Sequence, residues 1–287
     1  MRHAWLFLLP SLALLAAVLL WPFGYAIYMS LSDFSSGTSG TTFVGLKNYI
    51  EIGTDPRFWS ALWTTSTLAF FALGVELTSG LLIALALSSL GRGAHAFVVA
   101  MFLPYIVTPV VSGLILKWMF VSNWGLIDAT FLSLGVQTPD WLGDPFFAKL
   151  TVILADAWVS TPLVILILFA ALQQVDSSQL EAARIDGGSS LQIARFVILP
   201  TVAPMLIFVA SVRLMDFFRS FDVIYVLTGG GPGTATETLT MLTYQWGFRA
   251  FQAGKASALG LVTLCIVFAM IFLIATLGPR ALGRSAK

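Results

Sequence analysis

An all-α protein that crosses a membrane six times is the fold class that the sequence predicts, and two observations predict it. Hydrophobic residues make up 58% of the 287 residues and charged residues only 10%, whereas a soluble domain is about 45–50% apolar and about 25% charged. The apolar residues also gather in six stretches, and a helix crosses the hydrocarbon layer in about 20 residues. The net charge of +1 argues against nucleic-acid binding, and the single cysteine excludes a disulfide framework or a Cys-rich metal site.

Each of the six stretches is interpreted as one membrane-spanning helix. In chain order they are Ala4–Ser32, Phe58–Gly91, Gly93–Leu116, Leu150–Leu172, Phe196–Val212 and Ala256–Pro279. The first has no charged residue and is too long for the apolar core of a signal peptide, so we expect a retained anchor. The third contains Pro104 and Pro109. Because proline leaves a carbonyl unpaired and bends a helix, this bend either shapes a gate or serves packing alone.

The distribution of basic residues favours both chain ends in the cytoplasm, because Lys and Arg concentrate on the inner side of membrane proteins. In this orientation the inner segments hold Arg2, Arg92, Arg184, Arg195, Arg280, Arg284 and Lys287. The outer loops collect acids instead, namely Asp33, Glu51, Asp55, Asp128, Asp140, Asp144, Asp222 and Glu237. The bias is moderate, since the outer segments also hold Lys47, Arg57, Arg249 and Lys255.

One inner loop, between the fourth and fifth spans, is long enough to hold its own structure. Ser178 followed three residues later by Glu181 has the pattern of a capping box, which predicts the start of a short helix. The pair Gly187-Gly188 ends that helix, because glycine tolerates the left-handed conformation. Ser189 or Ser190 caps the next helix, which continues into the fifth span. The loop therefore predicts two short helices joined at a glycine elbow.

The spacing in this loop resembles the EAA signature of inner-membrane permease subunits of binding-protein-dependent ABC importers. It reads Glu181-Ala182-Ala183, three residues, Gly187, nine residues, Val197, one residue and Leu199-Pro200. The family has Ile at the position of Val197 and commonly Ala at Gly188, and both departures are mild. The resemblance implies a type I ABC importer permease fold in which residues 173–198 couple to a cytoplasmic ATPase. The implied coupling residues are Glu181, Ala182, Ala183, Asp186 and Gly187. The alternative is a loop that merely happens to be capped and broken by glycine.

Two further segments are similar to carbohydrate-type permeases. They are Phe221–Pro232, at the outer end of the fifth span, and Gly45–Tyr49, ahead of the second. The resemblance thus covers nearly the whole chain and points to the subunit that resembles the first maltose-permease component. It implies a single permease domain, residues 1–287, in a bacterial cytoplasmic membrane. The implied partners are a second homologous permease, two ATPase subunits, an extracytoplasmic binding protein, a sugar and membrane lipid, with no nucleic acid. ATP and Mg would be bound by the ATPase, so no cofactor is expected in this chain.

The fifth span carries the candidate substrate face. It continues through Arg213, Asp216, Phe217 and Ser220, which are spaced i, i+3, i+4 and i+7 and so share one helical face. Charges inside a span are costly and usually face a cavity or a partner. An arginine, an acid, a ring and a hydroxyl suit a polyhydroxylated ligand, and the resemblance implies that this face lines a sugar cavity. The alternative is an Arg213–Asp216 ion pair that only packs helices.

The second and fourth spans add three polar residues. Asp156 and Ser160 share a face of the fourth span, and the resemblance implies sugar contacts there. Asp156 fits equally well as the partner of a basic residue on the second permease. Glu76 in the second span has no obvious partner, and a structural pair with Lys117 is the alternative to a functional role. The predicted substrate-binding set is Asp156, Ser160, Arg213, Asp216, Phe217 and Ser220.

The function expected from these residues is that of a permease subunit in an ATP-driven sugar importer. An ATP-independent secondary transporter or channel for a small polar solute is the alternative, and it predicts no ATPase partner. An enzyme ranks third, because His3 and His95 are the only histidines and complete no hydrolase or metal-binding pattern. A polyol, a disaccharide or glycerol phosphate would all suit the face described. Arg213 is compatible with a negatively charged solute, whereas the nearby carboxylate of Asp216 argues against one.

Overall fold

The structure is a computed structural model that describes residues 4–34, 42–90 and 93–282, with side chains described between residues 9 and 276. Of the basic residues that favoured cytoplasmic ends, Arg2, Arg92, Arg284 and Lys287 lie outside the described residues, as does His3, and the side chain of Arg280 is also not described. The described chain is built almost wholly of helices, with one pair of two-residue strands.

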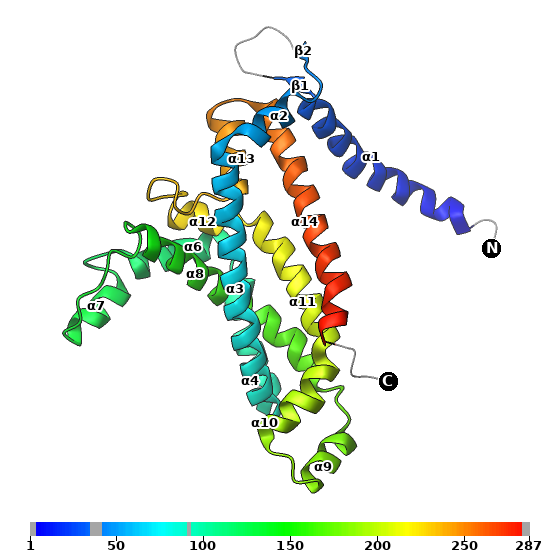
Figure 1. Ribbon diagram of the computed structural model, residues 1–287, viewed down its shortest axis with the longest axis vertical. Helices are drawn as coiled ribbons and strands as arrows, with labels where there is room; N and C mark the ends of the chain where they lie inside the picture. Colours follow the sequence, from blue (N-terminus) through cyan, green and yellow to red (C-terminus); the bar gives the residue numbers. More distant parts are fainter. Residues whose placement is uncertain (1–3, 35–41, 91–92, 283–287) are drawn as a thin grey trace. The chain divides into compact units, whose positions relative to one another are not determined.

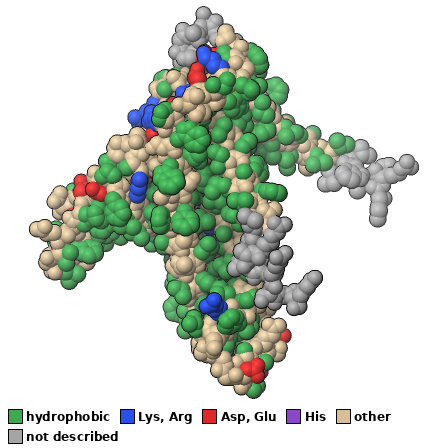
Figure 2. All heavy atoms as spheres, in the orientation of Figure 1, with side chains coloured by type: hydrophobic (Ala, Val, Ile, Leu, Met, Phe, Trp, Pro, Cys, Tyr) green, Lys and Arg blue, Asp and Glu red, His purple; other side chains and the backbone are tan. Residues whose placement is uncertain are grey.

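Five helical segments of the described residues are long and apolar enough to cross a membrane. They lie in α1 (Ala4–Ser30), α3 (Pro56–Ser88), α8 (Pro145–Leu172), α10 to α11 (Ser190–Ile193, a π-helical turn Ala194–Ile198 and Leu199–Arg219) and α14 (Ala253–Leu282). Large apolar side chains are exposed along them, and Figure 2 shows hydrophobic groups over most of the face drawn. Such a surface is expected where lipid, and not water, is the solvent.

The third predicted span is broken rather than gently bent. It consists of α4 (Ala94–Met101), α5 (Leu103–Ile106) and α6 (Pro109–Phe120), and the axis turns by 91° before α6. Val107 and Thr108 have extended backbone, with ψ of 136° and 140°. The residue before a proline avoids the helical region, so Pro109 ends one helix and begins the next. Counted as one span, this pair completes the six that the sequence predicts.

Short elements connect the spans. They are β1 (Ser32–Asp33), β2 (Thr42–Phe43), α2 (Lys47–Thr54), α7 (Leu126–Ser133), α9 (Ser177–Ile185), α12 (Asp222–Leu227) and α13 (Leu239–Tyr244), with a π-helical turn at Gln245–Arg249. Figure 1 shows α9 beyond the ends of α8 and α10, and charged side chains appear over this end of the molecule in Figure 2.

The helices pack in two compact units. The first comprises Met1–Leu62 and Leu239–Ile266. In it, the antiparallel pair β1–β2 follows α1, and the Asn48 side chain of α2 donates hydrogen bonds to the carbonyl oxygens of Ser30 (2.8 Å) and Ser32 (3.1 Å). The first bond satisfies a carbonyl that the end of α1 leaves without a helical partner, and the second ties β1 to α2. The single permease domain expected from the sequence stays a prediction.

The second unit comprises Trp63–Thr238 and Val267–Lys287 and holds the candidate site. Its core is made by apolar side chains of α3, α4, α8 and α11, which include Ala84, Val98, Leu168 and Val209. Helix α8 contacts α4, α5, α6, α11 and α12. Because α8 lies among these helices, its polar residues Asp156 and Ser160 are held inside protein and away from lipid.

Candidate functional site

The helix of the inner loop begins earlier than the capping-box pattern suggests. Asp176 is the residue before α9, and its carboxylate accepts a 2.9 Å hydrogen bond from the backbone N–H of Ser178. The predicted capping box of Ser178 and Glu181 is therefore wrong, since Ser178 already lies inside the helix. Aspartate is among the best N-cap residues and stands two positions upstream. The hydrogen bond from Ser178 holds the pKa of Asp176 below its usual range.

The glycine elbow is confirmed. Gly187 has φ of +78°, its N–H donates to the carbonyl of Arg184 (3.0 Å), and the N–H of Gly188 donates to the carbonyl of Ala183 (3.0 Å). These two bonds make a Schellman motif, which needs a left-handed residue at the position of Gly187. Ser189 caps α10 in a capping box with Gln192, as one of the two serines was predicted to do. Hydrogen bonds between neighbouring residues thus stabilise both the end of α9 and the start of α10.

The predicted coupling residues lie on the surface of this elbow. Glu181, Ala182, Asp186 and Gly187 are exposed and Ala183 is half-buried. Apolar side chains are exposed beside them, with Ile185 at 85% and Leu191 at 78%. An exposed apolar surface in a polar loop is typical of a protein contact.

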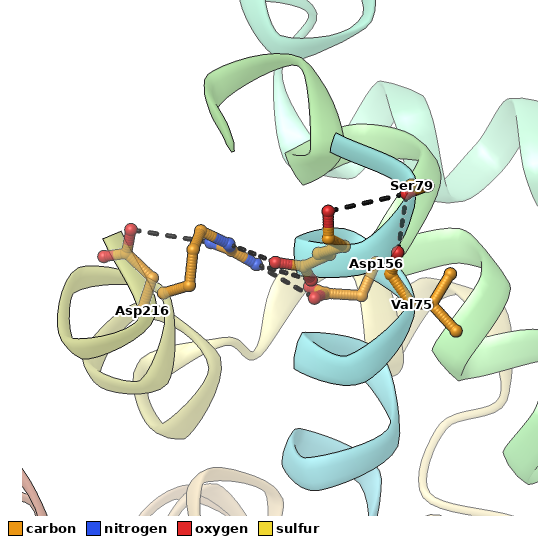
Figure 3. Close-up of polar contacts among 6 residues, drawn as sticks. Val75, Ser79, Asp156 and Asp216 are labelled. Carbon is orange, nitrogen blue, oxygen red and sulfur yellow. Dashed lines mark hydrogen bonds and ion pairs between the residues drawn. The ribbon is translucent and has the colours of Figure 1, made fainter. Parts of the chain in front are cut away.

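A charged cluster joins three helices of the second unit. Arg213 of α11 donates from Nε to Glu76 Oε2 of α3 (2.7 Å) and from Nη2 to Glu76 Oε1 (3.2 Å) and to Asp156 Oδ2 of α8 (2.9 Å). Its Nη1 lies 3.5 Å from Asp216 Oδ2, and Asp216 also pairs with Arg219 at 2.9 Å. In Figure 3, Asp216 and Asp156 lie on opposite sides of the guanidinium group. One arginine is therefore shared by three carboxylates.

Burial makes this cluster energetically demanding. Arg213 is 4% exposed and Glu76 is fully buried. A buried charge is tolerated only when it is paired, and removal of one partner leaves the other uncompensated. The partner of Glu76 is thus Arg213, and the alternative pair with Lys117 is wrong. Asp156 likewise has its basic partner within this chain, although the sequence left open a partner on a second subunit.

A glycine lets α3 reach the cluster. Gly80 lies one turn after Glu76, and a Cβ at this position would lie 2.6 Å from Cγ1 of Val164 in α8. Any larger side chain would push the two helices apart. The glycine therefore permits a close approach of α3 to α8 one turn from Glu76, whose carboxylate contacts Arg213 of α11.

The cluster forms one wall of a cavity of about 420 Å³. The lining residues are Tyr105, Val107, Pro109, Asp156, Val159, Ser160, Arg213, Asp216, Arg219, Ser220, Phe221, Asp222 and Val223. Five of the six predicted substrate-binding residues lie here. The broken third span also contributes to the cavity, because Tyr105, Val107 and Pro109, at its break, are among the lining residues.

Phe217 is the sixth residue, and it does not line the cavity. Its ring is 1% exposed and belongs to the packed interior. Helix α11 ends at Arg219 and Ser220 is extended, with ψ of 126°, so the chain turns and the next aromatic residue, Phe221, lines the cavity instead. The ring of Phe221 stacks on Tyr225 with centroids 5.0 Å apart. Phe217 itself lies within α11, about 100° around the helix from Asp216, and spacing alone does not tell which flank of the helix meets the cavity.

Comparison with known proteins establishes the family. A family model for the inner membrane component of binding-protein-dependent transport systems matches residues 76–283. The chain belongs to this family. The matched range includes the charged cluster, the cavity and the α9 elbow. The protein is thus a multi-pass inner-membrane permease.

Two relatives and one solved structure cover nearly the whole permease. The trehalose/maltose transport system permease protein MalF of Thermococcus litoralis is 31% identical over 95% of this chain and 92% of that protein. The sn-glycerol-3-phosphate transport system permease protein UgpA of Yersinia pseudotuberculosis is 30% identical over 93% of this chain and 90% of that protein. A bacterial ABC transporter involved in the import of the acidic polysaccharide alginate matches with a TM-score of 0.82 at 19% identity, over 97% of this chain and 96% of that one. The fold is therefore that of an ABC importer permease, as the sequence predicts.

Proposed function

We propose that this permease is one of two membrane subunits of an ATP-driven importer for a sugar or related polyhydroxylated solute. It pairs with a second homologous permease, two ATPase subunits and an extracytoplasmic binding protein. Hydrolysis belongs to the ATPase, which binds ATP and Mg, and no residue of this chain performs chemistry. Both chain ends and the α9 elbow then lie in the cytoplasm.

The exposed elbow is the observation that carries this proposal. Its Schellman motif fixes the direction of α9 relative to α10, and α10 continues through the π-helical turn into α11. Helix α11 carries Arg213 and Asp216 of the cavity wall. A force applied to α9 by an ATPase would therefore pass through the elbow and reach the cavity along the continuous helical stretch Ser190–Arg219. An ATP-independent transporter has no use for such an element.

ATP-driven uptake by the reconstituted complex tests the proposal. Glu181→Ala should lower both solute uptake and the stimulation of ATP hydrolysis by the loaded binding protein, while the complex still assembles. Glu51→Ala is the matched control, because Glu51 is an exposed glutamate of α2 that pairs with exposed Lys47 at 3.9 Å, and it should leave both rates unchanged. Uptake that proceeds without ATP would favour the secondary transporter and overturn the proposal.

The orientation has its own test. In a variant with Cys265 replaced by Ser, a cysteine introduced by Ser178→Cys in α9 should react with a membrane-impermeant thiol reagent only in inside-out vesicles. Lys47→Cys in α2 should react only in right-side-out vesicles or intact cells. The opposite pattern would place the elbow outside and contradict the proposed topology.

A further inference from the structure

We propose that the cavity accepts an uncharged polyhydroxylated solute and excludes one that carries a phosphate or carboxylate group. This inference deepens the proposed import function and rests on it. The relatives do not decide the question, since proteins named for trehalose/maltose transport and for glycerol-3-phosphate transport are 31% and 30% identical to this chain. The charges of the cavity wall do decide it.

Arg213, the buried arginine of the cavity, already has carboxylates of this chain as its partners. Its Nε and Nη2 donate to Glu76 and Asp156 at 2.7–3.2 Å, and Nη1 faces Asp216 at 3.5 Å. A phosphate that approached Arg213 would have to displace a carboxylate, and that carboxylate would remain buried without its partner. Breaking such a pair costs far more than a new ion pair returns. Arg213 therefore neutralises carboxylates of this chain and does not bind an anionic solute.

The wall as a whole is acidic. Its charged lining residues are three aspartates, Asp156, Asp216 and Asp222, and two arginines, Arg213 and Arg219. Glu76 lies behind Arg213 and adds a further carboxylate. The second arginine is also engaged, because Arg219 Nη2 lies 2.9 Å from Asp216 Oδ1 and the side chain is otherwise 77% exposed. With acids in excess, the potential in the cavity repels an anion.

The remaining lining groups suit hydroxyl groups. Carboxylate oxygens of Asp156 and Asp216 accept strong hydrogen bonds from O–H donors, and Ser160 presents a hydroxyl from α8. Tyr105 and Phe221 provide rings on which the apolar face of a sugar packs. The volume of about 420 Å³ falls within the range of about 300–1,000 Å³ usual for small-molecule sites. A neutral sugar can therefore hydrogen-bond to the carboxylates and the hydroxyl of the wall and pack on its aromatic rings.

Direct binding to the purified complex tests this inference. The complex, without its binding protein, is placed in nanodiscs and offered radiolabelled trehalose, maltose, sucrose and glycerol as neutral probes, and glycerol 3-phosphate and a disaccharide uronate as anionic probes. At least one neutral probe should bind at least tenfold more tightly than either anion. Equal or tighter binding of an anion, or saturable binding of no neutral probe, would overturn the inference. ATP-dependent uptake is scored separately, so a failure of the import function is distinguished from a failure of the charge argument.

Variants of the wall locate the selectivity in this cavity. Asp216→Asn and Asp222→Asn each remove one negative charge, and each should reduce the ratio of neutral to anionic affinity by about fivefold, as expected for unit charges at about 4 Å in water. Glu51→Gln removes the same charge from an exposed site on α2 and should leave the ratio unchanged. If both wall variants keep the wild-type ratio, another part of the complex selects against anions and the inference is wrong.

Discussion

The α9 elbow and the Arg213 cluster are organised in opposite ways, although both depend on polar groups. Every hydrogen bond that shapes the elbow joins residues at most five positions apart, and most side chains of the elbow are exposed. The cluster joins Arg213 to residues 137 and 57 positions away, and it is buried. Local capping can define a surface that meets a partner, whereas a buried charge needs several helices in place before it is tolerated. Substitutions in the cluster should therefore affect stability strongly, and substitutions in the elbow should affect coupling.

The largest effect is expected in the cluster. Glu76→Ala removes the carboxylate that accepts two hydrogen bonds from Arg213 and should destabilise the complex by about 3–5 kcal/mol. The loss should appear as a lower unfolding temperature in detergent. Glu76→Gln keeps the shape and should cost less. The exposed control Glu51→Ala should cost no more than about 0.5 kcal/mol. Equal losses for Glu76→Ala and Glu51→Ala would mean that the cluster does not support the fold.

The approach of α3 to α8 should be the next most sensitive feature. Gly80→Ala places a Cβ 2.6 Å from Val164 Cγ1 and should cost about 1–3 kcal/mol through overpacking. Gly74→Ala on the same helix meets nothing within 4 Å, so it should be neutral or stabilising, because alanine favours the helix. The unfolding temperatures of the Gly80→Ala and Gly74→Ala variants, measured under the same conditions, test this expectation. Similar unfolding temperatures would show that the helices have room to separate.

The elbow can be separated from the cluster with a matched glycine pair. Gly187 and Gly135 both have positive φ, +78° and +77°, at the ends of α9 and α7. Alanine at either position should cost about 1–2 kcal/mol of local strain. Only Gly187→Ala should lower the stimulation of ATP hydrolysis by the loaded binding protein. If Gly135→Ala uncouples hydrolysis to the same extent, the elbow has no special role.

The smallest effect is expected at the N-cap of α9. Asp176→Ala removes the acceptor of the Ser178 N–H and should speed amide exchange in α9 by about fivefold or less. Because folding lowers the pKa of Asp176 from its ordinary value of 3.8, its contribution is complete above that value and disappears as the pH falls through the folded pKa. Wild-type and Asp176→Ala exchange should therefore converge at low pH. A difference that persists there would assign the effect to another residue.

Sequence patterns predict the spans and the elbow well, because both depend on neighbouring residues. Hydrophobic length predicts each span, and the Gly187-Gly188 pair predicts the turn that the structure contains. The partner of Glu76 could not be predicted, since a pair 137 positions apart depends on how α3, α8 and α11 pack together. The i+4 spacing from Arg213 predicts Phe217 on the substrate face, but consecutive residues of a helix lie about 100° apart. Phe217 therefore packs in the interior while its neighbour Asp216 lines the cavity. Spacing predicts which residues share one side of a helix, whereas the flank that meets the cavity depends on how α11 packs against its neighbours.

Contact between the elbow and an ATPase tests the central claim most directly. In a variant with Cys265 replaced by Ser, the complex carrying Asp186→Cys in the elbow is treated with a short cysteine-to-amine cross-linker. We expect a cross-linked product that contains this chain and the ATPase subunit, and no such product for Lys47→Cys in α2. An elbow cysteine that stays fully open to water-soluble reagents in the assembled complex and never joins the ATPase would contradict this claim.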